Sequence, residues 1–186
     1  GCAGTQLDRV KGLSATGDDF TQELYADYIA LSSAEFSEGD YSDSDVFALR
    51  ARDAAAGTVV QPEEIASRNL PAGTVADLTE ARARLVAALD AGARGAHPEV
   101  AARAQTQFDC WMQEQEEDFQ SDHIAACRAG FLAAMDELDA LMAPPAMEQE
   151  MAVAPKVFRV YFGFDDASLS AAAMTTVNAA NRYAAS

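Results

Sequence analysis

The sequence has no long apolar run. A helix that spans a membrane needs about 18 or more consecutive apolar residues, whereas the most apolar stretch, Ile124–Met135, is interrupted by Arg128. We therefore do not expect the polypeptide to cross a membrane. The charged and apolar leader of a secretory signal is also missing, because the sequence opens directly on Gly1, Cys2 and Ala3. A signal that has already been removed would account for this.

Basic residues are scarce as well. Lys and Arg number 13 against 30 Asp and Glu, which gives a formal net charge of −17. A field of this sign repels phosphate backbones and anionic lipid head groups, so nucleic acid is excluded as a partner. The acids are spread along the chain and do not form one block, which is typical of a solvated surface that keeps a protein soluble.

Motifs of catalysis and metal binding are not recognisable. There is no Ser/His/Asp elbow, phosphate-binding glycine loop or pair of isolated buried carboxylates, and no Cys-x-x-Cys pair or Cys/His cluster. His97 and His123 are expected at surface or capping positions, because neither has a second His or Cys at ligand spacing. We therefore expect no enzyme, no metal and no cofactor.

One acidic run is the exception that needs weighing. Glu114, Glu116, Glu117 and Asp118 could attract a cation. Hard cations, however, need turns that bring several oxygens together, as in the Ca²⁺ loop pattern. We interpret the run as a solvated helix end.

The cysteines number three, at positions 2, 110 and 127. Cys110 and Cys127 lie at equal distances from a break at 117–121 between two helical patterns, so an antiparallel hairpin brings them level. A disulfide needs Cα atoms about 4.4–6.8 Å apart, closer than helices usually pack. Small residues nearby would permit that approach: Ala125, Ala126, Ala129 and Gly130. Two buried free thiols are the alternative; a disulfide indicates an oxidising compartment such as the periplasm.

Helical periodicity dominates the region 18–142, where we predict a bundle of about five helices. The first runs from 18 or 19 to about 36. A shorter helix around 47–54 has capping side chains at 42–45 and can end at Gly57. A single turn is expected at 62–64. The apolar stripe of the first helix consists of Phe20, Leu24, Tyr28 and Leu31.

The other three helices have clear starts. Thr74 can cap a helix that continues to Gly92 or Gly95 and carries a favourable pair, Glu80 with Arg84, on its exposed side. Pro98 suits the first position of the next helix, and the last begins at 121 or 122 and ends near 142. The expected buried positions of the last two are Val100, Ala104, Phe108 and Trp111, then Ile124, Cys127, Phe131, Leu138 and Leu141 or Met142.

The sequence changes character at residue 143. Three prolines and scattered acids make 143–155 a linker. Beyond it, 156–164 is rich in β-branched and aromatic residues and predicts a largely buried strand, followed by a helix over about 168–183. One strand and one helix cannot bury each other's faces, so the pair looks like the beginning of an α/β domain.

The N-terminal residues resemble the cleavage end of a bacterial lipoprotein signal, in which a small residue precedes the modified cysteine. The residues that carry this are Gly1-Cys2-Ala3 and the small, polar Gly4-Thr5-Gln6. The resemblance implies a lipid on Cys2, and several acyl chains are enough for stable anchoring. An incidental terminal cysteine is the alternative.

The run Val160-Tyr161-Phe162-Gly163-Phe164-Asp165-Asp166, with Leu169 and an Ala-rich helix, resembles the first strand and helix of OmpA-like peptidoglycan-binding domains. Phe108-Asp109-Cys110-Trp111 and Ile124-Ala125-Ala126-Cys127-Arg128 resemble the N-terminal region of OmpA-family lipoproteins. The resemblance implies that Phe164 and Asp165 contact the wall peptide at its edge. The family's main aspartate and arginine follow the first helix and have no counterparts here, which implies a longer parent.

The expected organisation is therefore a lipid-anchored tether (1–17), a disulfide-stapled helical bundle (18–142), a linker (143–155) and the start of an OmpA-like α/β domain (156–186). The fold class is mainly α. The expected function is a non-catalytic outer-membrane lipoprotein, on the periplasmic face, that links the membrane to peptidoglycan. Two alternatives remain open: a helical interaction protein that recruits an envelope partner, and a helical carrier of a small ligand.

Overall fold

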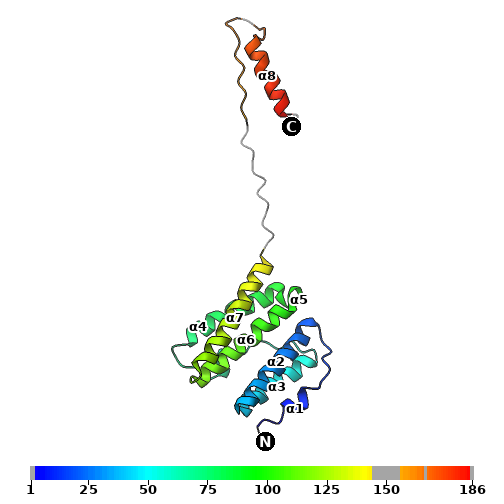
Figure 1. Ribbon diagram of the computed structural model, residues 1–186, viewed down its shortest axis with the longest axis vertical. Helices are drawn as coiled ribbons and strands as arrows, with labels where there is room; N and C mark the ends of the chain where they lie inside the picture. The colour runs from blue at the N-terminus through cyan, green and yellow to red at the C-terminus, as the bar shows by residue number, and fades with distance from the viewer. Residues whose placement is uncertain (1–2, 144–155, 166, 185–186) are drawn as a thin grey trace. The chain divides into compact units, whose positions relative to one another are not determined.

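The structure is a computed structural model that describes residues 3–143, 156–165 and 167–184 (Figure 1). The chain divides into two compact units, Gly1–Pro144 and Pro145–Ser186, here called unit 1 and unit 2. The described residues are mainly helical and form no β-strand. The prediction of a mainly α protein with a helical bundle is confirmed.

Two long helices form the first hairpin of unit 1. α2 (Asp19–Glu38) begins at Asp18, whose carboxylate accepts the backbone N–H of Thr21, and ends at Gly39 with a φ of +91°. α3 (Tyr41–Ala55) follows almost at once. Its cap is Asp40, which accepts the backbone N–H groups of residues 42 and 43. The cap therefore lies just before the predicted stretch 42–45, because the turn after α2 is tighter than expected.

The middle of unit 1 is less regular. η1 (Ile65–Ser67) is a single 3-10 turn a few residues later than predicted, and α4 (Val75–Ala88) begins after Thr74 as expected. The hydroxyl of Thr74 donates to the carbonyl of Pro71 and does not cap the helix. A π-type segment, η2 (Leu89–Ala93), with Gly92 at a φ of +106°, leads into α5 (Arg94–Ala96).

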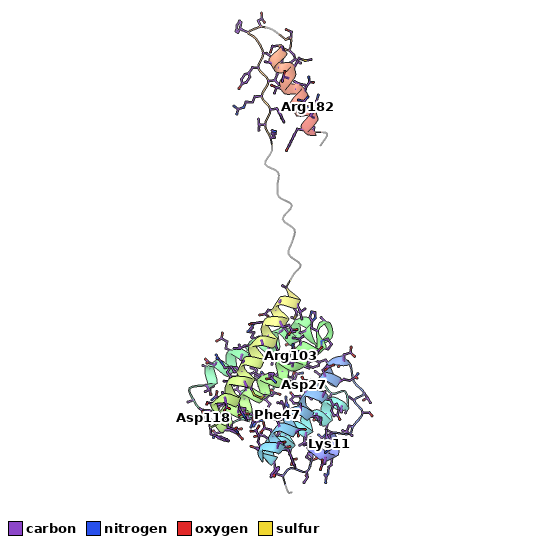
Figure 2. All side chains as sticks on the ribbon, in the orientation of Figure 1. Lys11, Asp27, Phe47, Arg103, Asp118 and Arg182 are labelled. Atoms are coloured by element: carbon purple, nitrogen blue, oxygen red, sulfur yellow. A yellow bond between two sulfur atoms is a disulfide. The ribbon has the colours of Figure 1, made fainter. Side chains whose placement is uncertain are left out.

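The second long hairpin consists of α6 (Pro98–Glu117) and α7 (Ser121–Met142), with proline at the start of α6 as predicted. α6 ends at Asp118, whose φ of +52° is left-handed, and this residue lies at the tip of the helix in Figure 2. Phe108 and Trp111 of α6 pack on Phe131 of α7, with ring centroids 5.7 and 5.9 Å apart.

One continuous core holds these helices together. The predicted stripes are largely buried, although Leu31 is only partly buried and Leu141 is exposed. A short helix that the sequence did not predict, α1 (Leu7–Val10), also belongs to unit 1. Its first and last residues, Leu7 and Val10, are both buried. The largest fully buried side chains are Tyr28, Phe20, Phe47, Phe108, Phe131, Leu24, Leu78, Leu85, Leu89, Met112, Met135 and Leu138.

Unit 2 contains α8 (Ala171–Ala184) and, before it, residues 156–165 in a non-helical course. The ring of Phe158 lies 5.9 Å from that of Tyr183, so this segment runs back along α8 (Figure 1). The predicted strand at 156–164 is wrong for the described residues, because a strand exists only through hydrogen bonds to a neighbouring strand. Helix α8, which satisfies its own backbone, does form.

Among the described residues, no helix is both long enough and apolar enough to span a bilayer.

Candidate functional site

Cys2, the predicted site of lipid attachment, lies outside the described residues. The residues just after it are held by the bundle. The backbone N–H groups of Gly4 and Gln6 donate to the two carboxylate oxygens of Asp45, at 2.9 and 2.8 Å. The hydroxyl of Tyr25 donates to the carbonyl of Val10. Residues 4–10 are therefore part of unit 1.

The predicted disulfide is present. Cys110 on α6 and Cys127 on α7 are bonded, with Cα atoms 5.7 Å apart. Of the small residues expected to permit this approach, only Gly130 faces α6: a Cβ atom there would lie 2.3 Å from Oε1 of Gln107. Ala125, Ala126 and Ala129 are exposed. Of these four positions, Gly130 is therefore the one that lies in the contact between the two helices.

Phe164 and Asp165, the residues suggested for peptide contact, are neighbours on the exposed turn before α8. Phe164 has no part of its side chain buried, with a relative exposure of 103%. Asp165 has a φ of +57°. No described residue joins Phe164 and Asp165 to form a binding site. A site at this turn would therefore need groups from outside the described part of the chain.

A buried polar network joins three helices at Asp109. Its carboxylate, fully buried on α6, accepts from the Tyr28 hydroxyl at 2.5 Å, from Arg50 at 2.8 Å and from the backbone N–H of Glu63 at 2.8 Å. Gln105 donates to the same hydroxyl. Burial raises the pKa of Asp109 to about 6, while the positive charge of Arg50 lowers it. Every partner comes from within unit 1, and we interpret the network as structural.

Arg68 forms a second cluster on the same side. Its guanidinium contacts the carboxylates of Glu63 at 2.7 Å, Asp43 at 2.5 Å and Glu116 at 3.1 Å. Glu116 also accepts the backbone N–H of Asn69. The sequence predicted Glu116 to be part of a solvated helix end. In the structure it instead binds residues 68 and 69 and connects this loop to α6. A cavity of about 590 Å³ lies beside this cluster and is lined by charged side chains of both signs.

A third cluster is largely acidic and lies at the C-terminal ends of α2 and α6 and at the N-terminal end of α3. Glu35 and Glu38 are in the last turn of α2, Asp40 caps α3, and Glu114 and Glu117 are in the last turn of α6. Glu35 and Glu114 are each only 4% exposed. The sequence interpretation of Glu114 as a solvated residue is wrong, because packing of the two hairpins covers it.

Burial and mutual repulsion perturb these acids. Burial, followed by the charges of Glu114, Glu38 and further carboxylates, raises the pKa of Glu35 to about 8. Burial and then the hydrogen bond and charge of Asp40 raise the pKa of Glu117 to about 7. The pKa of Glu114 is also raised by burial, although His123 opposes this. The cluster therefore favours protons or another cation near neutral pH.

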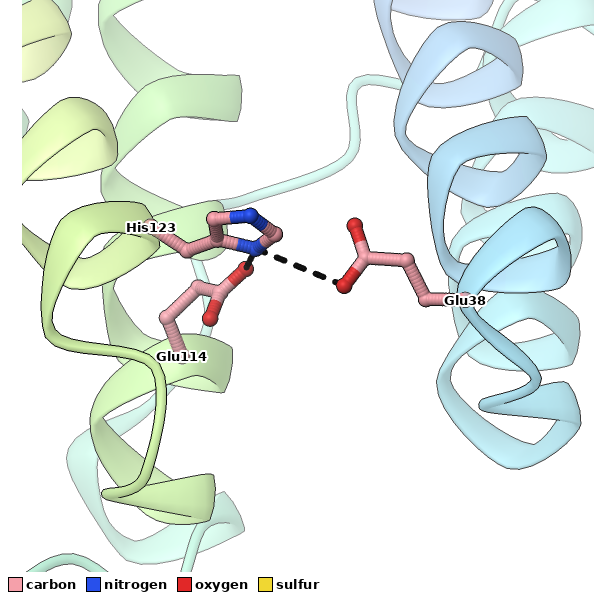
Figure 3. Close-up of side chains that lie close together, drawn as sticks. All are labelled: Glu38, Glu114 and His123. Carbon is pink, nitrogen blue, oxygen red and sulfur yellow. Dashed lines mark ion pairs between the residues drawn. The ribbon is translucent and has the colours of Figure 1, made fainter.

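His123 is the basic residue that enters this cluster. Its Nδ1 atom lies 3.4 Å from an oxygen of Glu38 and 3.4 Å from an oxygen of Glu114 (Figure 3). The three side chains come from α2, α6 and α7, and their ligand atoms lie within 4.8 Å of one another. His97, in contrast, precedes α6 without a side-chain cap bond.

Trp111 is buried as predicted, and it borders a cavity of about 300 Å³ between α4, α6 and α7. The guanidinium of Arg128 lies 5.4 Å from the indole centroid. Among the described residues, the indole N–H has no hydrogen-bond partner. The cavity has mixed apolar and charged walls.

Comparison with protein-family models, with curated proteins and with solved structures finds no match to this chain.

The acidic cluster was missed by sequence reasoning, although a signal for it exists. Glu35 and Glu38 near the end of one helix have the same three-residue spacing as Glu114 and Glu117 at the end of another. Neither helix carries Lys, Arg or His in its last turn. Acidic residues at the C-terminus of a helix are unfavourable because of the helix dipole. The repeated pattern therefore marked both helix ends as candidate functional positions.

Proposed function

We propose that this protein is a non-catalytic lipoprotein of a bacterial outer membrane, anchored through Cys2 and attached to peptidoglycan through a domain that begins at residue 156. The bundle acts as a spacer or docking module on the periplasmic face. The observation that carries the proposal is the state of 156–164, an apolar segment that lies along α8 with one side uncovered.

The side chains of residues 157–161 alternate in exposure. Phe158 and Val160 are partly buried, whereas Val157 and Tyr161 are 74% and 75% exposed; the alternation ends at Phe162, which is 58% exposed. Alternation of this kind is the pattern of a strand with one face already covered. Further strands paired with its edges would satisfy its backbone, as the resemblance to OmpA-like domains implies.

The disulfide supports an exported protein. Disulfides persist in oxidising compartments, of which the periplasm is one, and are rare in reducing ones. The charge of −17 makes attraction to anionic lipid head groups unfavourable. A covalent lipid at Cys2 would provide attachment that does not depend on charge.

The anchor is tested by fractionating native cells that express Cys2→Ser. The variant is expected to move from the membrane pellet to the soluble periplasm. A matched control replaces both Cys110 and Cys127 by serine, which should leave any folded protein in the pellet. An unmodified N-terminal mass for the protein from native membranes would contradict the anchor.

Wall attachment is tested by sedimentation with purified peptidoglycan sacculi. Protein from native membranes is expected to cosediment, whereas a form ending at Met142, which keeps the bundle, is expected to remain in solution. Equal cosedimentation of the two forms would assign binding to the bundle and contradict the role given to unit 2.

The cavity at Trp111 favours one other function, a carrier of a small ligand. Its volume is near the lower end for ligand pockets, and its walls combine the rings of Trp111 and Phe131 with charged side chains. The protein has a single tryptophan. Native mass spectrometry would detect a bound ligand, and the fluorescence of Trp111 should change when it is removed.

A further inference from the structure

The C-terminal ends of α2 and α6 concentrate negative charge. Each helix has carboxylates in its last turn, Glu35 and Glu38 on α2, and Glu114 and Glu117 on α6. The C-terminus of a helix already carries roughly half a negative charge, so cations are favoured there and anions are not. Asp40 adds a further carboxylate between the two ends. The arrangement is costly for the folded protein unless a cation joins it.

The position of such a cation is indicated by Glu38, Glu114 and His123. A tetrahedral zinc site with bonds of about 2.0–2.1 Å has ligand atoms about 3.4 Å apart along each edge. The Nδ1 atom of His123 is 3.4 Å from one oxygen of each glutamate. Figure 3 shows both carboxylates directed at the same edge of the imidazole ring. Two of the three separations therefore match tetrahedral coordination, and the oxygens of Glu38 and Glu114 lie within 4.8 Å of each other.

An independent observation points to the same place. Glu114 is 4% exposed, and among the described residues its Oε2 atom is buried without a hydrogen-bond partner. Gln113, fully buried next to it, has an unpartnered Oε1 atom and donates from Nε2 to Glu35. Leaving a buried carboxylate oxygen unsatisfied destabilises the fold. A metal ion bound by both oxygens of the Glu114 carboxylate would remove that penalty.

We propose that Glu38, Glu114 and His123 bind one divalent transition-metal ion, with Zn²⁺ the best fit. An imidazole ligand together with carboxylates favours Zn²⁺ and its neighbours, whereas Ca²⁺ and Mg²⁺ prefer oxygen ligands alone. Glu38 also lines a cavity of about 490 Å³. The proposal does not depend on the proposed envelope function.

Binding would join the two hairpins of unit 1. Glu38 belongs to the α2–α3 hairpin, and Glu114 and His123 belong to the α6–α7 hairpin. The disulfide links only α6 with α7. A bound metal would therefore supply the cross-link between hairpins that the disulfide does not, and it is expected to raise the melting temperature.

The test is a calorimetric titration of the full chain, stripped with chelator and free of any affinity tag, with ZnCl₂ at neutral pH. We expect saturable binding of one Zn²⁺ per chain. His123→Gln and Glu38→Gln should each weaken it by at least about tenfold, since even outer-shell changes at metal sites reach that size. The chain has a second histidine, so His97→Gln is the matched control and should bind as the unchanged protein does.

A second readout separates loss of a ligand from loss of the fold. Added Zn²⁺ should raise the melting temperature of the unchanged protein and of His97→Gln, and leave that of His123→Gln unchanged. Glu38 is more exposed than Glu114, so Glu38→Gln is the variant expected to fold normally by circular dichroism. The absence of saturable binding, or equal binding by a folded His123→Gln, would show that the three residues form a hydrogen-bonded ion triad only and would overturn the proposal.

Discussion

Units 1 and 2 both contain amphipathic or apolar segments, but these segments are buried in unit 1 and remain largely exposed in the described part of unit 2. In unit 1 the apolar stripes of several helices meet, and Tyr28, Phe47 and Phe131 become almost fully buried. In the described part of unit 2, Ala173 is the one buried residue. Both units nevertheless contain a well-formed helix. Helices satisfy their backbone groups locally, whereas burial and strand pairing depend on other parts of a chain.

The comparison predicts that the stability of the protein lies in unit 1, and the largest effect should come from Asp109. Asp109→Ala leaves Arg50 partly buried without its partner and removes an acceptor from Tyr28. Loss of one member of a buried pair costs about 3–5 kcal/mol. Urea unfolding followed by Trp111 fluorescence measures this. Asp139→Ala, at an exposed pair with Arg84, should cost at most about 1 kcal/mol; equal losses would contradict a structural role for Asp109.

Removal of the disulfide is expected to have the next largest effect. It closes a loop with a sequence separation of 17, and a loop of about that length is stabilised by roughly 3 kcal/mol. Cys110→Ser with Cys127→Ser should lower the free energy of unfolding of the bundle by about that amount. The same urea titration measures it. Denaturing, non-reducing thiol labelling of the unchanged protein should leave both cysteines unmodified, and quantitative labelling would disprove the bond.

The acidic cluster should make the stability of unit 1 depend on pH. Because the folded protein raises the pKa of Glu35 from 4.5 to about 8, the folded state binds more protons between these values. Stability is then fully present below about pH 4.5 and is lost as the pH rises to about 8, by at most about 1.4 kcal/mol per pH unit for each proton.

Glu35→Gln should therefore reduce this slope in metal-free protein and raise the melting temperature at pH 8. Glu99→Gln, at an exposed position, should leave the slope unchanged. The groups that face Glu35 include Glu114, Glu38, Asp43 and Glu117, and each of them remains in both variants. A slope that is the same in Glu35→Gln as in the unchanged protein would contradict the assignment.

The smallest effect is expected in unit 2. Tyr183→Ala removes the ring contact with Phe158 and the contact with Lys156, both of which lie within that unit. The unfolding of the bundle, followed by Trp111 fluorescence, should change by less than about 0.5 kcal/mol, as for most surface substitutions. A larger change would show that the two units stabilise each other.

Local rules predicted much of the fold of unit 1. The starts of α2, α4, α6 and α7 lie where they were predicted. The Asp18 cap of α2 and the proline at the start of α6 act as expected, because these signals depend on residues within one turn. The disulfide was predictable because a hairpin with a short turn places symmetric positions opposite each other. The outcome at 156–164 was not predictable from that segment. A strand forms only by pairing with another strand, and the segment's own sequence does not specify that partner.

Residues of the candidate site show the same division. The predicted local pair of Glu80 with Arg84 is replaced by contacts from Arg84 to Asp136 and Asp139 of α7, at 3.0 and 2.6 Å. A sequence window contains the i,i+4 neighbour but not the side chains of another helix. For the same reason, no pattern around His123 revealed the two glutamates of other helices that lie beside it.

The sequence by itself therefore determined the long helices, most of their buried faces and the pairing of Cys110 with Cys127, because periodicity and short turns act within a few residues. Only the tertiary structure decided which acidic side chains became buried and which groups surround them. Asp109 received Arg50 and Tyr28 as partners, whereas Glu114 received one histidine and further carboxylates. Both are acids on the same helix, and what distinguishes them is the charge that the packing of α2, α3 and α7 brings within a few ångströms.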